Sequence, residues 1–208
     1  IKPDVILHFA SDIFDSKEKD IWENNILGTS NILKVAENND VKQIIFTSTF
    51  SIFEKNYKKP ISEIEPISAK NIYGISKANA EEGLLKIAKD TKLEVTIIRP
   101  PLIYGPNVKA NFASLLKLAK INLPLPLGSV NNKRSFVALD NLVDLIITCI
   151  NHHKAGNQIF LVSDNNDIST SKLYSLMVEA YGNKPRLIKI STKVLKLIGL
   201  LFGKKEVV

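Results

Sequence analysis

The chain has 208 residues, of which 45% are hydrophobic and 24% are charged, a composition typical of a soluble globular protein. This length is enough for one sizeable domain with a small additional lobe. The net charge of +7 comes almost entirely from lysines scattered over polar stretches, with only three arginines in the chain. A nucleic-acid-binding protein more often shows a clustered basic stripe, so we interpret the charge as solvated surface and expect no nucleic-acid partner.

The chain carries little that points to metal binding, secretion or membrane insertion. Cys149 is the single cysteine and lies in an apolar run, which indicates a buried, inert thiol in a reducing compartment. The three histidines form no metal-ligand cluster, so no metal site is predicted. No signal peptide is visible, and no apolar stretch approaches the ~20 residues of a spanning helix. These features predict a cytoplasmic protein without an integral membrane segment.

The first half of the chain alternates short apolar runs with helical patterns. Strands are expected at 5–9, 44–48 and 95–99, and helices at 19–38 and 73–89, with a polar loop at 58–69. Alternating strands and helices imply right-handed crossovers. The predicted fold class is therefore α/β, with a doubly wound parallel sheet.

The pattern changes after Pro106. Helices are expected at 112–119, 141–150, 170–181 and 191–202, strands at 134–137 and 158–162, and an extended segment at 123–128. Asp140 is a candidate N-cap of the second of these helices.

Tyr73 and Lys77 form the most chemically informative pair. Their spacing places a phenol and an ammonium on one helix face. A nearby ammonium favours the phenolate and lowers the pKa of a tyrosine, which makes the pair an acid/base device. An ordinary helix-surface pair is the alternative.

The predicted strand ends give this pair a context. Ligands of open parallel sheets sit beyond the carboxyl ends of the strands. There, the second strand ends in the hydroxyl cluster 47–49, and the Tyr73 helix begins at the same edge. A hydroxyl of Thr49 and the phenol of Tyr73 are therefore expected to meet on one substrate carbonyl.

Six stretches carry a resemblance to a known family. They are residues 4–10, 24–29, 45–49, 73–77, 99–106 and 134–141, which read DVILHFA, NNILGT, IFTST, YGISK, RPPLIYGP and RSFVALDN. In this order they resemble the extended short-chain dehydrogenase/reductase family, in its branch of NAD-dependent epimerases and dehydratases of nucleotide sugars. The resemblance implies a Rossmann-like dinucleotide-binding domain in residues 1–106. It assigns 107–208 mostly to a small substrate-binding lobe, with some segments returning to the main sheet.

The resemblance also implies roles for single residues. Tyr73 would be the acid/base at the sugar 4-hydroxyl, Lys77 would hold the nicotinamide ribose and keep Tyr73 acidic, and Thr49 would hydrogen-bond the same sugar oxygen. The cofactor-binding residues would be Phe9, Ala10, Ser11, Asn25, Thr47, Tyr73, Lys77 and Pro100. Asn111 and Arg134 would hold the nucleotide diphosphate, which suits a guanidinium that grips phosphate bidentately.

Three of these assignments have structural alternatives. Asn25 is alternatively a helix-surface residue, Arg134 a member of an ordinary salt bridge, and Asn111 the cap of the following helix.

The implied activity is that of an NAD(P)-dependent enzyme acting at sugar C4, most like a UDP-hexose 4-epimerase. NAD is the expected cofactor with NADP left open, the substrate is a UDP-sugar, and a homodimer is also left open. A UDP-4-keto-sugar reductase of surface-polysaccharide synthesis and a truncated, non-catalytic nucleotide-sugar binder are the alternatives. Dehydration is disfavoured, because Phe50 and Ser51 stand where family dehydratases carry Asp-Glu.

The largest departure from the family is the lack of a Gly-x-x-Gly-x-x-Gly turn. By family comparison roughly the first 60 residues are missing, so we expect the N-terminal strands to be absent and the chain to be a fragment. Strand 5–9 would then be an exposed apolar edge. The basic, amphipathic stretch 191–205 also raises membrane-surface association, for which a helix packed on the domain is the favoured alternative.

Overall fold

The computed structural model describes residues 2–12, 17–53, 59–191 and 193–195. The chain divides into two compact units, which are described separately. The first unit contains Ile1–Leu102 and Val137–Ser163, and the second contains Ile103–Phe136 and Asp164–Val208. The assignment of cofactor binding to 1–106 and of substrate binding to 107–208 stays a prediction.

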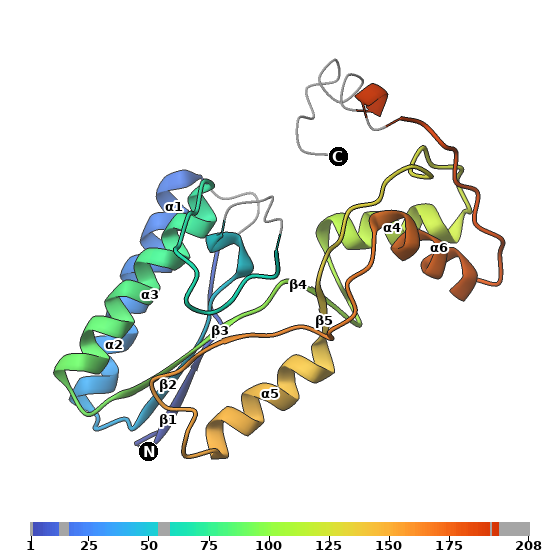
Figure 1. Cartoon of the computed structure of the whole chain (residues 1–208). Coiled ribbons are helices and arrows are strands. Elements are labelled where there is room, and N and C mark those ends of the chain that lie inside the picture. Colours follow the sequence, from blue (N-terminus) through green and yellow to red (C-terminus); the bar gives the residue numbers. More distant parts are fainter. Residues whose placement is uncertain (1, 13–16, 54–58, 192, 196–208) are drawn as a thin grey trace. The chain divides into compact units, whose positions relative to one another are not determined.

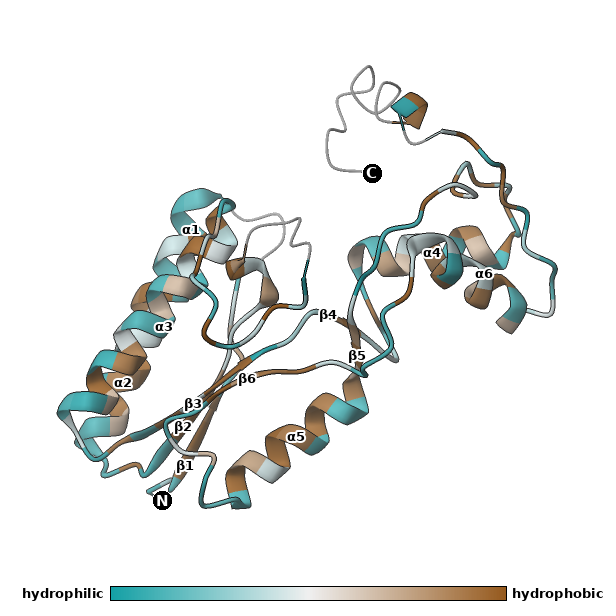
Figure 2. Ribbon diagram, viewed as in Figure 1, coloured by the Kyte–Doolittle hydropathy of each residue, from teal (hydrophilic) through white to brown (hydrophobic). Residues whose placement is uncertain are grey.

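A four-stranded parallel sheet forms the centre of the first unit. Its strands are β1 (Val5–His8), β2 (Gln43–Thr47), β3 (Glu94–Arg99) and β6 (Ile159–Leu161), in the order β1-β2-β3-β6. All three pairings are parallel, and Figure 2 shows these strands mostly in the colours of hydrophobic residues. The parallel pairings confirm the predicted parallel sheet. The apolar runs in its strands are typical of parallel sheets that are covered on both faces.

Helices cover both faces of this sheet (Figure 1). The helices α2 (Gly28–Asn38) and α3 (Ile72–Asp90) pack on one face, and α5 (Leu139–Asn151) lies on the other. On the first face the core comprises Leu33, Ala36, Val41, Ile44, Phe46, Ala80, Leu84, Leu93, Val95 and Ile97. On the second face Gln43 Nε2 of β2 donates to the carbonyl of Cys149 in α5, at 3.2 Å. The doubly wound arrangement is therefore confirmed.

The helix predicted at 19–38 is confirmed, and its hydrogen-bonding pattern changes along its length. It consists of α1 (Glu18–Trp22), the π-helical turn η1 (Glu23–Leu27) and α2. The π-helical turn was not predicted, because apolar spacing does not distinguish i→i+4 from i→i+5 hydrogen bonding. Such π-bulges are frequent at functional sites, and this one contains the predicted site residue Asn25.

β1 lies at an edge of the sheet, as the sequence predicts. Within the described part of the chain it pairs with β2 alone. Leu7 and Phe9 are 42% and 49% exposed, so the edge is apolar. An exposed apolar edge strand is a site for association with other chains.

The second unit is built around two helices, α4 (Ala110–Lys120) and α6 (Thr170–Ala180). They pack together around the fully buried Tyr174. Both were predicted, and Ser169 caps α6 by accepting from the backbone N–H of Lys172 at 3.1 Å. The segment predicted as extended at 123–128 pairs with a later part of the chain through an isolated parallel bridge between Leu125 and Leu187.

Two short strands and a helix start differ in detail from the predictions. β4 (Leu102–Tyr104) was not predicted and pairs with β5 (Phe136–Ala138) in a separate ladder. The chain resumes an extended path directly after the two prolines at 100 and 101, which the sequence pattern treats only as a stop. The N-cap of α5 is Ala138 and not Asp140, which lies in the first helical turn. An acidic residue in that turn is stabilised by the helix dipole.

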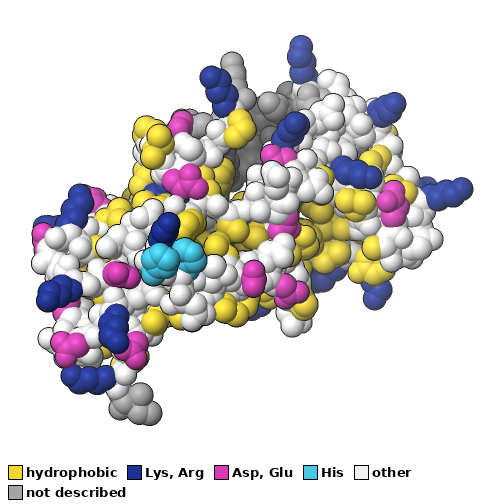
Figure 3. Space-filling view, turned by 60° about the horizontal axis from the view of Figure 1, so that its bottom comes forward, with side chains coloured by type: hydrophobic (Ala, Val, Ile, Leu, Met, Phe, Trp, Pro, Cys, Tyr) yellow, Lys and Arg dark blue, Asp and Glu magenta, His cyan; other side chains and the backbone are white. Residues whose placement is uncertain are grey.

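Most of the helix predicted at 191–202, and with it the membrane-surface hypothesis for 191–205, falls outside the described residues. Among the residues that are described, none of the helices has the length and hydrophobicity needed to span a bilayer. On the face shown in Figure 3, basic and acidic side chains are interspersed over the surface.

Candidate active site

The phenol of Tyr73 lies at the carboxyl edge of the sheet, where two hydroxyls meet it. Tyr73 stands in the first turn of α3, whose N-cap Asn71 accepts from the Gly74 N–H at 2.7 Å. The side chains of Ser11 and Thr49 hydrogen-bond the phenol. These hydroxyls come from the segments that follow β1 and β2. The structure therefore brings three predicted site residues together, from three separate segments.

Thr49 is held in a defined orientation. It is the N-cap of the short 3₁₀ turn η2 (Phe50–Ile52), and its Oγ1 accepts from the Ser51 N–H at 3.1 Å. This bond occupies one lone pair of the Thr49 oxygen. The hydroxyl proton and the second lone pair are left for the bond with the Tyr73 phenol. Phe50, next along this turn, has no group for proton transfer.

Burial raises the pKa of Tyr73, and the hydrogen bonds with Ser11 and Thr49 lower it by less. The prediction that Lys77 keeps this pKa low was wrong for the protein alone. Removing a phenol from water disfavours the phenolate, and here that effect dominates. Tyr73 is thus held as a neutral phenol at pH 7, which is the proton-donating form.

Lys77 is itself buried, with 1% of its surface exposed. Its Nζ lies 4.1 Å from the ring centroid of Phe46 in β2, a cation–π contact. Burial lowers the pKa of Lys77 to about 8, against the opposing effect of the Glu81 carboxylate. Lys77 is therefore mostly cationic at pH 7.

Asn25 connects the segment after β1 to α3. Its Oδ1 accepts from the Asp12 N–H at 2.8 Å and from the Ser11 hydroxyl at 3.3 Å. Its Nδ2 donates to the Asp12 carbonyl at 3.0 Å and to the Ser76 hydroxyl at 3.0 Å. Asn25 is 2% exposed, so the helix-surface alternative is excluded. These bonds hold Ser11 at the position where it meets Tyr73.

His8 ends β1 and carries an acceptor without a partner. The Thr29 hydroxyl donates to the Asn25 carbonyl at 2.6 Å, so its oxygen accepts from His8 Nε2 at 2.9 Å. The proton then resides on Nε2 of the neutral ring, and Nδ1 is an acceptor. Among the described residues, the buried His8 Nδ1, Thr47 Oγ1 and Ser48 Oγ have no hydrogen-bond partner. Buried polar atoms are normally paired, so this edge has unused hydrogen-bonding capacity for a polar ligand, as the predicted nicotinamide cofactor requires.

The remaining predicted cofactor residues lie at the same strand ends. Phe9 and Ala10 follow β1 and are exposed. Pro100 follows β3, is buried, and accepts from the Phe50 N–H at 2.9 Å through its carbonyl. That bond ties the end of β3 to the turn that Thr49 caps.

Asn111 and Arg134 belong to the second unit and are both exposed. Asn111 lies inside the first turn of α4, whose N-cap is Lys109, so it is not the cap itself. The backbone of Arg134 pairs with Ile168, and the described residues offer its side chain no ion pair. Their predicted hold on a diphosphate stays a prediction.

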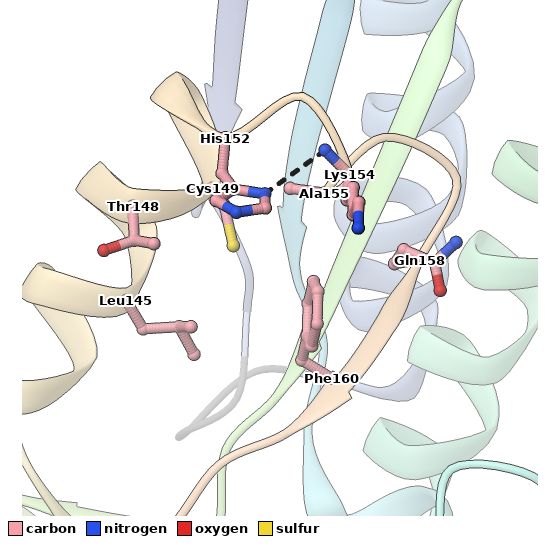
Figure 4. A pocket seen from close by; sticks show the side chains of 8 residues that line it. All are labelled: Leu145, Thr148, Cys149, His152, Lys154, Ala155, Gln158 and Phe160. Carbon is pink, nitrogen blue, oxygen red and sulfur yellow. Dashed lines mark hydrogen bonds between the residues drawn. The ribbon is translucent and has the colours of Figure 1, made fainter.

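A separate cavity of about 310 Å³ lies near the end of α5 and β6 (Figure 4). Its walls are Leu145, Thr148, Cys149, His152, Lys154, Ala155, Gln158 and Phe160. The His152 ring accepts from the Lys154 N–H at 3.2 Å, which closes the turn beside it. None of the predicted site residues lines this mostly apolar cavity, so it is not the candidate active site.

Residues 1–163 match the NAD dependent epimerase/dehydratase family. The chain belongs to this family. It is 41% identical over 213 aligned residues to a UDP-glucose 4-epimerase of Vibrio cholerae. The alignment covers 98% of this chain and 65% of that protein. The chain thus spans less than two thirds of this relative's length.

Solved structures agree on the fold. The structure of Pal from Bacillus thuringiensis superposes with a TM-score of 0.78 at 29% identity, covering 92% of this chain and 63% of Pal. A UDP-glucose 4-epimerase of Thermotoga maritima, solved with UDP-glucose, superposes with a TM-score of 0.77 at 22% identity, covering 94% of this chain and 70% of that one. The resemblance identified in the sequence and the predicted Rossmann-like fold class are confirmed.

Several residues of the site were missed by sequence reasoning. His8 is a polar residue inside an apolar run, and such an interruption is a signal that was available. Glu81 lies one turn after Lys77, at the spacing that makes ion pairs on helices. Ser76 and Gly74 carried no usable signal, because their importance depends on groups brought near by the fold.

The buried His8 predicts a pH dependence of stability. Burial, and next the charge of Lys77, lower the pKa of His8 from 6.5 to about 4. Between these values the unfolded chain binds a proton that the folded protein does not, so stability falls as the pH drops from 6.5 to 4. Wild type is expected to lose roughly 2–3 kcal/mol from this source between pH 7 and 4.5, at ~1.4 kcal/mol per pKa unit.

Urea unfolding at both pH values measures this loss. In the His8→Gln variant, whose amide can donate to Thr29 from the position of Nε2 but does not titrate, the loss between the two pH values is expected to be smaller by that amount. An equal loss in wild type and variant contradicts the prediction.

Proposed function

We propose that this protein is an NAD-dependent nucleotide-sugar 4-epimerase acting on a UDP-hexose. The observation that carries the proposal is the convergence of the Tyr73 phenol with the hydroxyls of Thr49 and Ser11 at the carboxyl edge of a parallel sheet. Membership in the NAD dependent epimerase/dehydratase family supports the class of chemistry. The name of the Vibrio cholerae relative supports the choice of UDP-glucose and its C4 epimer as substrates.

The bound cofactor would supply hydride acceptance and return at sugar C4. In the proposal, Tyr73 moves the proton of the sugar 4-hydroxyl, and Thr49 hydrogen-bonds the same oxygen. The neutral Tyr73 of the protein alone suits the proton-donating half of the cycle. For the proton-accepting half, the Lys77 ammonium is the nearby positive charge that favours a phenolate.

Other residues would hold the two ligands. Lys77 would bind the nicotinamide ribose, and the strand-end residues would line the cofactor, with His8 Nδ1 and Thr47 Oγ1 offering unpaired polar atoms. Arg134 and Asn111 would bind the diphosphate of the sugar nucleotide, the guanidinium bidentately.

A 4-keto reductase would use the same three groups, so the assay must separate it from an epimerase. Purified protein is incubated with UDP-glucose and a catalytic amount of NAD, and the sugar nucleotides are resolved by chromatography. The C4 epimer is expected, without net formation of NADH. Consumption of one NADH per 4-keto sugar, with no epimer from UDP-glucose, overturns epimerisation in favour of reduction. Binding of UDP-glucose without any turnover overturns the enzyme assignment in favour of a non-catalytic binder.

A further inference from the structure

Three charged side chains lie buried behind Tyr73. Lys77, Glu81 and Arg99 are 1%, 0% and 3% exposed. Glu81 Oε1 accepts from Arg99 Nε at 3.1 Å, and Glu81 Oε2 accepts from Arg99 Nη2 at 2.7 Å. Burying a charged group costs free energy unless the group is paired and hydrogen-bonded. A buried group of three charges is therefore a candidate for a role in function.

The three charges do not cancel. The Arg99 guanidinium stays charged at any working pH and occupies both oxygens of the Glu81 carboxylate. Two cations and one carboxylate leave one positive charge in excess, and it falls at Lys77. The titratable groups that act on Lys77 are Glu81 of its own helix and His8 of β1, which is neutral at pH 7. Tyr73 lies one turn before Lys77 on the same helix.

We propose that Glu81 is a positioning residue that acts through Lys77 and keeps its ammonium charged on the helix face that carries Tyr73, with Arg99 fixing the carboxylate. This inference rests on the proposed function, in which Lys77 acts on the cofactor and on Tyr73. Glu81 follows Lys77 at the i+4 position of α3, on the same face of the helix. Its charge opposes the burial that brings the pKa of Lys77 down to about 8. Without that carboxylate, less of the lysine is charged at pH 7.

The carboxylate is fixed from outside its own helix. Arg99 ends β3, and its Nη1 donates to the Glu63 carbonyl at 3.1 Å. Glu63 Oε1 in turn accepts from the Leu161 N–H of β6 at 3.2 Å. The guanidinium also lies 5.4 Å from the ring centroid of Phe53. Arg99 is thus held by a strand, a loop and an aromatic ring, and through Arg99 these contacts fix the position of the Glu81 carboxylate.

The test is a direct titration of Lys77 by NMR of the labelled lysine side chains, with the Lys77 signal assigned from its loss in Lys77→Arg. Glu81→Gln keeps the shape and removes the charge, and is expected to weaken proton binding at Lys77 about threefold or more. Glu82→Gln is the matched control, since Glu82 is the next residue of α3 and is exposed. It is expected to leave the Lys77 titration unchanged. Glu81→Asp, which restores the charge, is expected to recover most of the wild-type proton affinity.

Arg99→Gln separates a charge effect from general loosening of the site. If Glu81 acts through its charge, removal of the neighbouring cation leaves proton binding at Lys77 unchanged or stronger. The inference is overturned if Glu81→Gln leaves the titration unchanged, or if Glu81→Gln and Arg99→Gln weaken proton binding alike.

Where Glu81→Gln does not fold, the double variant E81Q/R99Q carries the test, because it does not leave the Arg99 guanidinium buried without its carboxylate. It is compared with Arg99→Gln, from which it differs by the charge of residue 81 alone. Weaker proton binding at Lys77 in the double variant supports the inference, and equal proton binding overturns it. The titration requires no substrate and no turnover. It therefore gives its answer whether or not the protein proves to be an epimerase.

Discussion

Tyr73→Phe is expected to lower turnover of the UDP-sugar by about 10²-fold or more, because it removes the hydroxyl that moves the substrate proton. The substitution deletes one oxygen atom and leaves the ring packing at the start of α3 intact. The hydroxyls of Ser11 and Thr49, which meet the phenol in the structure, remain in place. Aliphatic hydroxyls are much weaker acids than a phenol, so neither is expected to substitute for it. Initial rates of epimer formation at saturating cofactor measure the effect.

The matched control for this variant is Tyr181→Phe. Tyr181 lies at the end of α6 in the second unit and is 46% exposed. Its loss of a hydroxyl is expected to change turnover less than twofold. Wild-type turnover in Tyr73→Phe would remove this phenol from the mechanism, and an equal loss in both variants would point to a general effect of deleting a tyrosine hydroxyl.

Gly74→Ala is expected to damage both the fold and the site. A Cβ at Gly74 would lie 2.3 Å from the Ser51 carbonyl oxygen and 3.3 Å from the Ala69 Cβ. Backbone atoms cannot move aside as a flexible side chain can, so the first turn of α3 must shift away from the 3₁₀ turn. We expect a loss of roughly 1–3 kcal/mol in unfolding free energy, as for other overpacking substitutions. Tyr73 and Thr49 stand on the two sides of this contact, and a displacement of about 1 Å at a reacting group can cost about 10²-fold in rate.

Gly83→Ala on the same helix is the control. A Cβ there has no atom within 4 Å. Alanine in the interior of a helix is favoured over glycine by roughly 0.5–1 kcal/mol, so this variant is expected to be more stable with unchanged turnover. Chemical unfolding and initial rates distinguish the two variants. If Gly74→Ala behaved like Gly83→Ala, the close packing of α3 on the 3₁₀ turn would not control the site.

Much of the first unit follows from local sequence. The runs that form β2 and β3 are apolar because both faces of these strands are buried. The spacing of the apolar residues in α3 places its buried face against the sheet. Parallel strands joined by helices then bring their carboxyl ends to one edge. The placement of Tyr73 and Thr49 at one edge of the sheet therefore follows from the sequence.

Other features depend on groups that only folding brings together. The sequence pattern predicts an acidic Tyr73, whereas its pKa is raised, because the extent of burial around a phenol is not contained in its spacing from a lysine. The π-helical turn around Asn25 and the buried pairing of Glu81 with Arg99 are equally invisible to periodicity.

The sequence by itself determined the family, the parallel sheet and the identity of the groups at the candidate site, because these depend on residue type and spacing along the chain. Only the tertiary structure decided their protonation and their packing, as at Lys77 and Gly74. The reason is physical: desolvation, close approach and buried charge are properties of the surroundings of a side chain, and residues distant in sequence make up those surroundings.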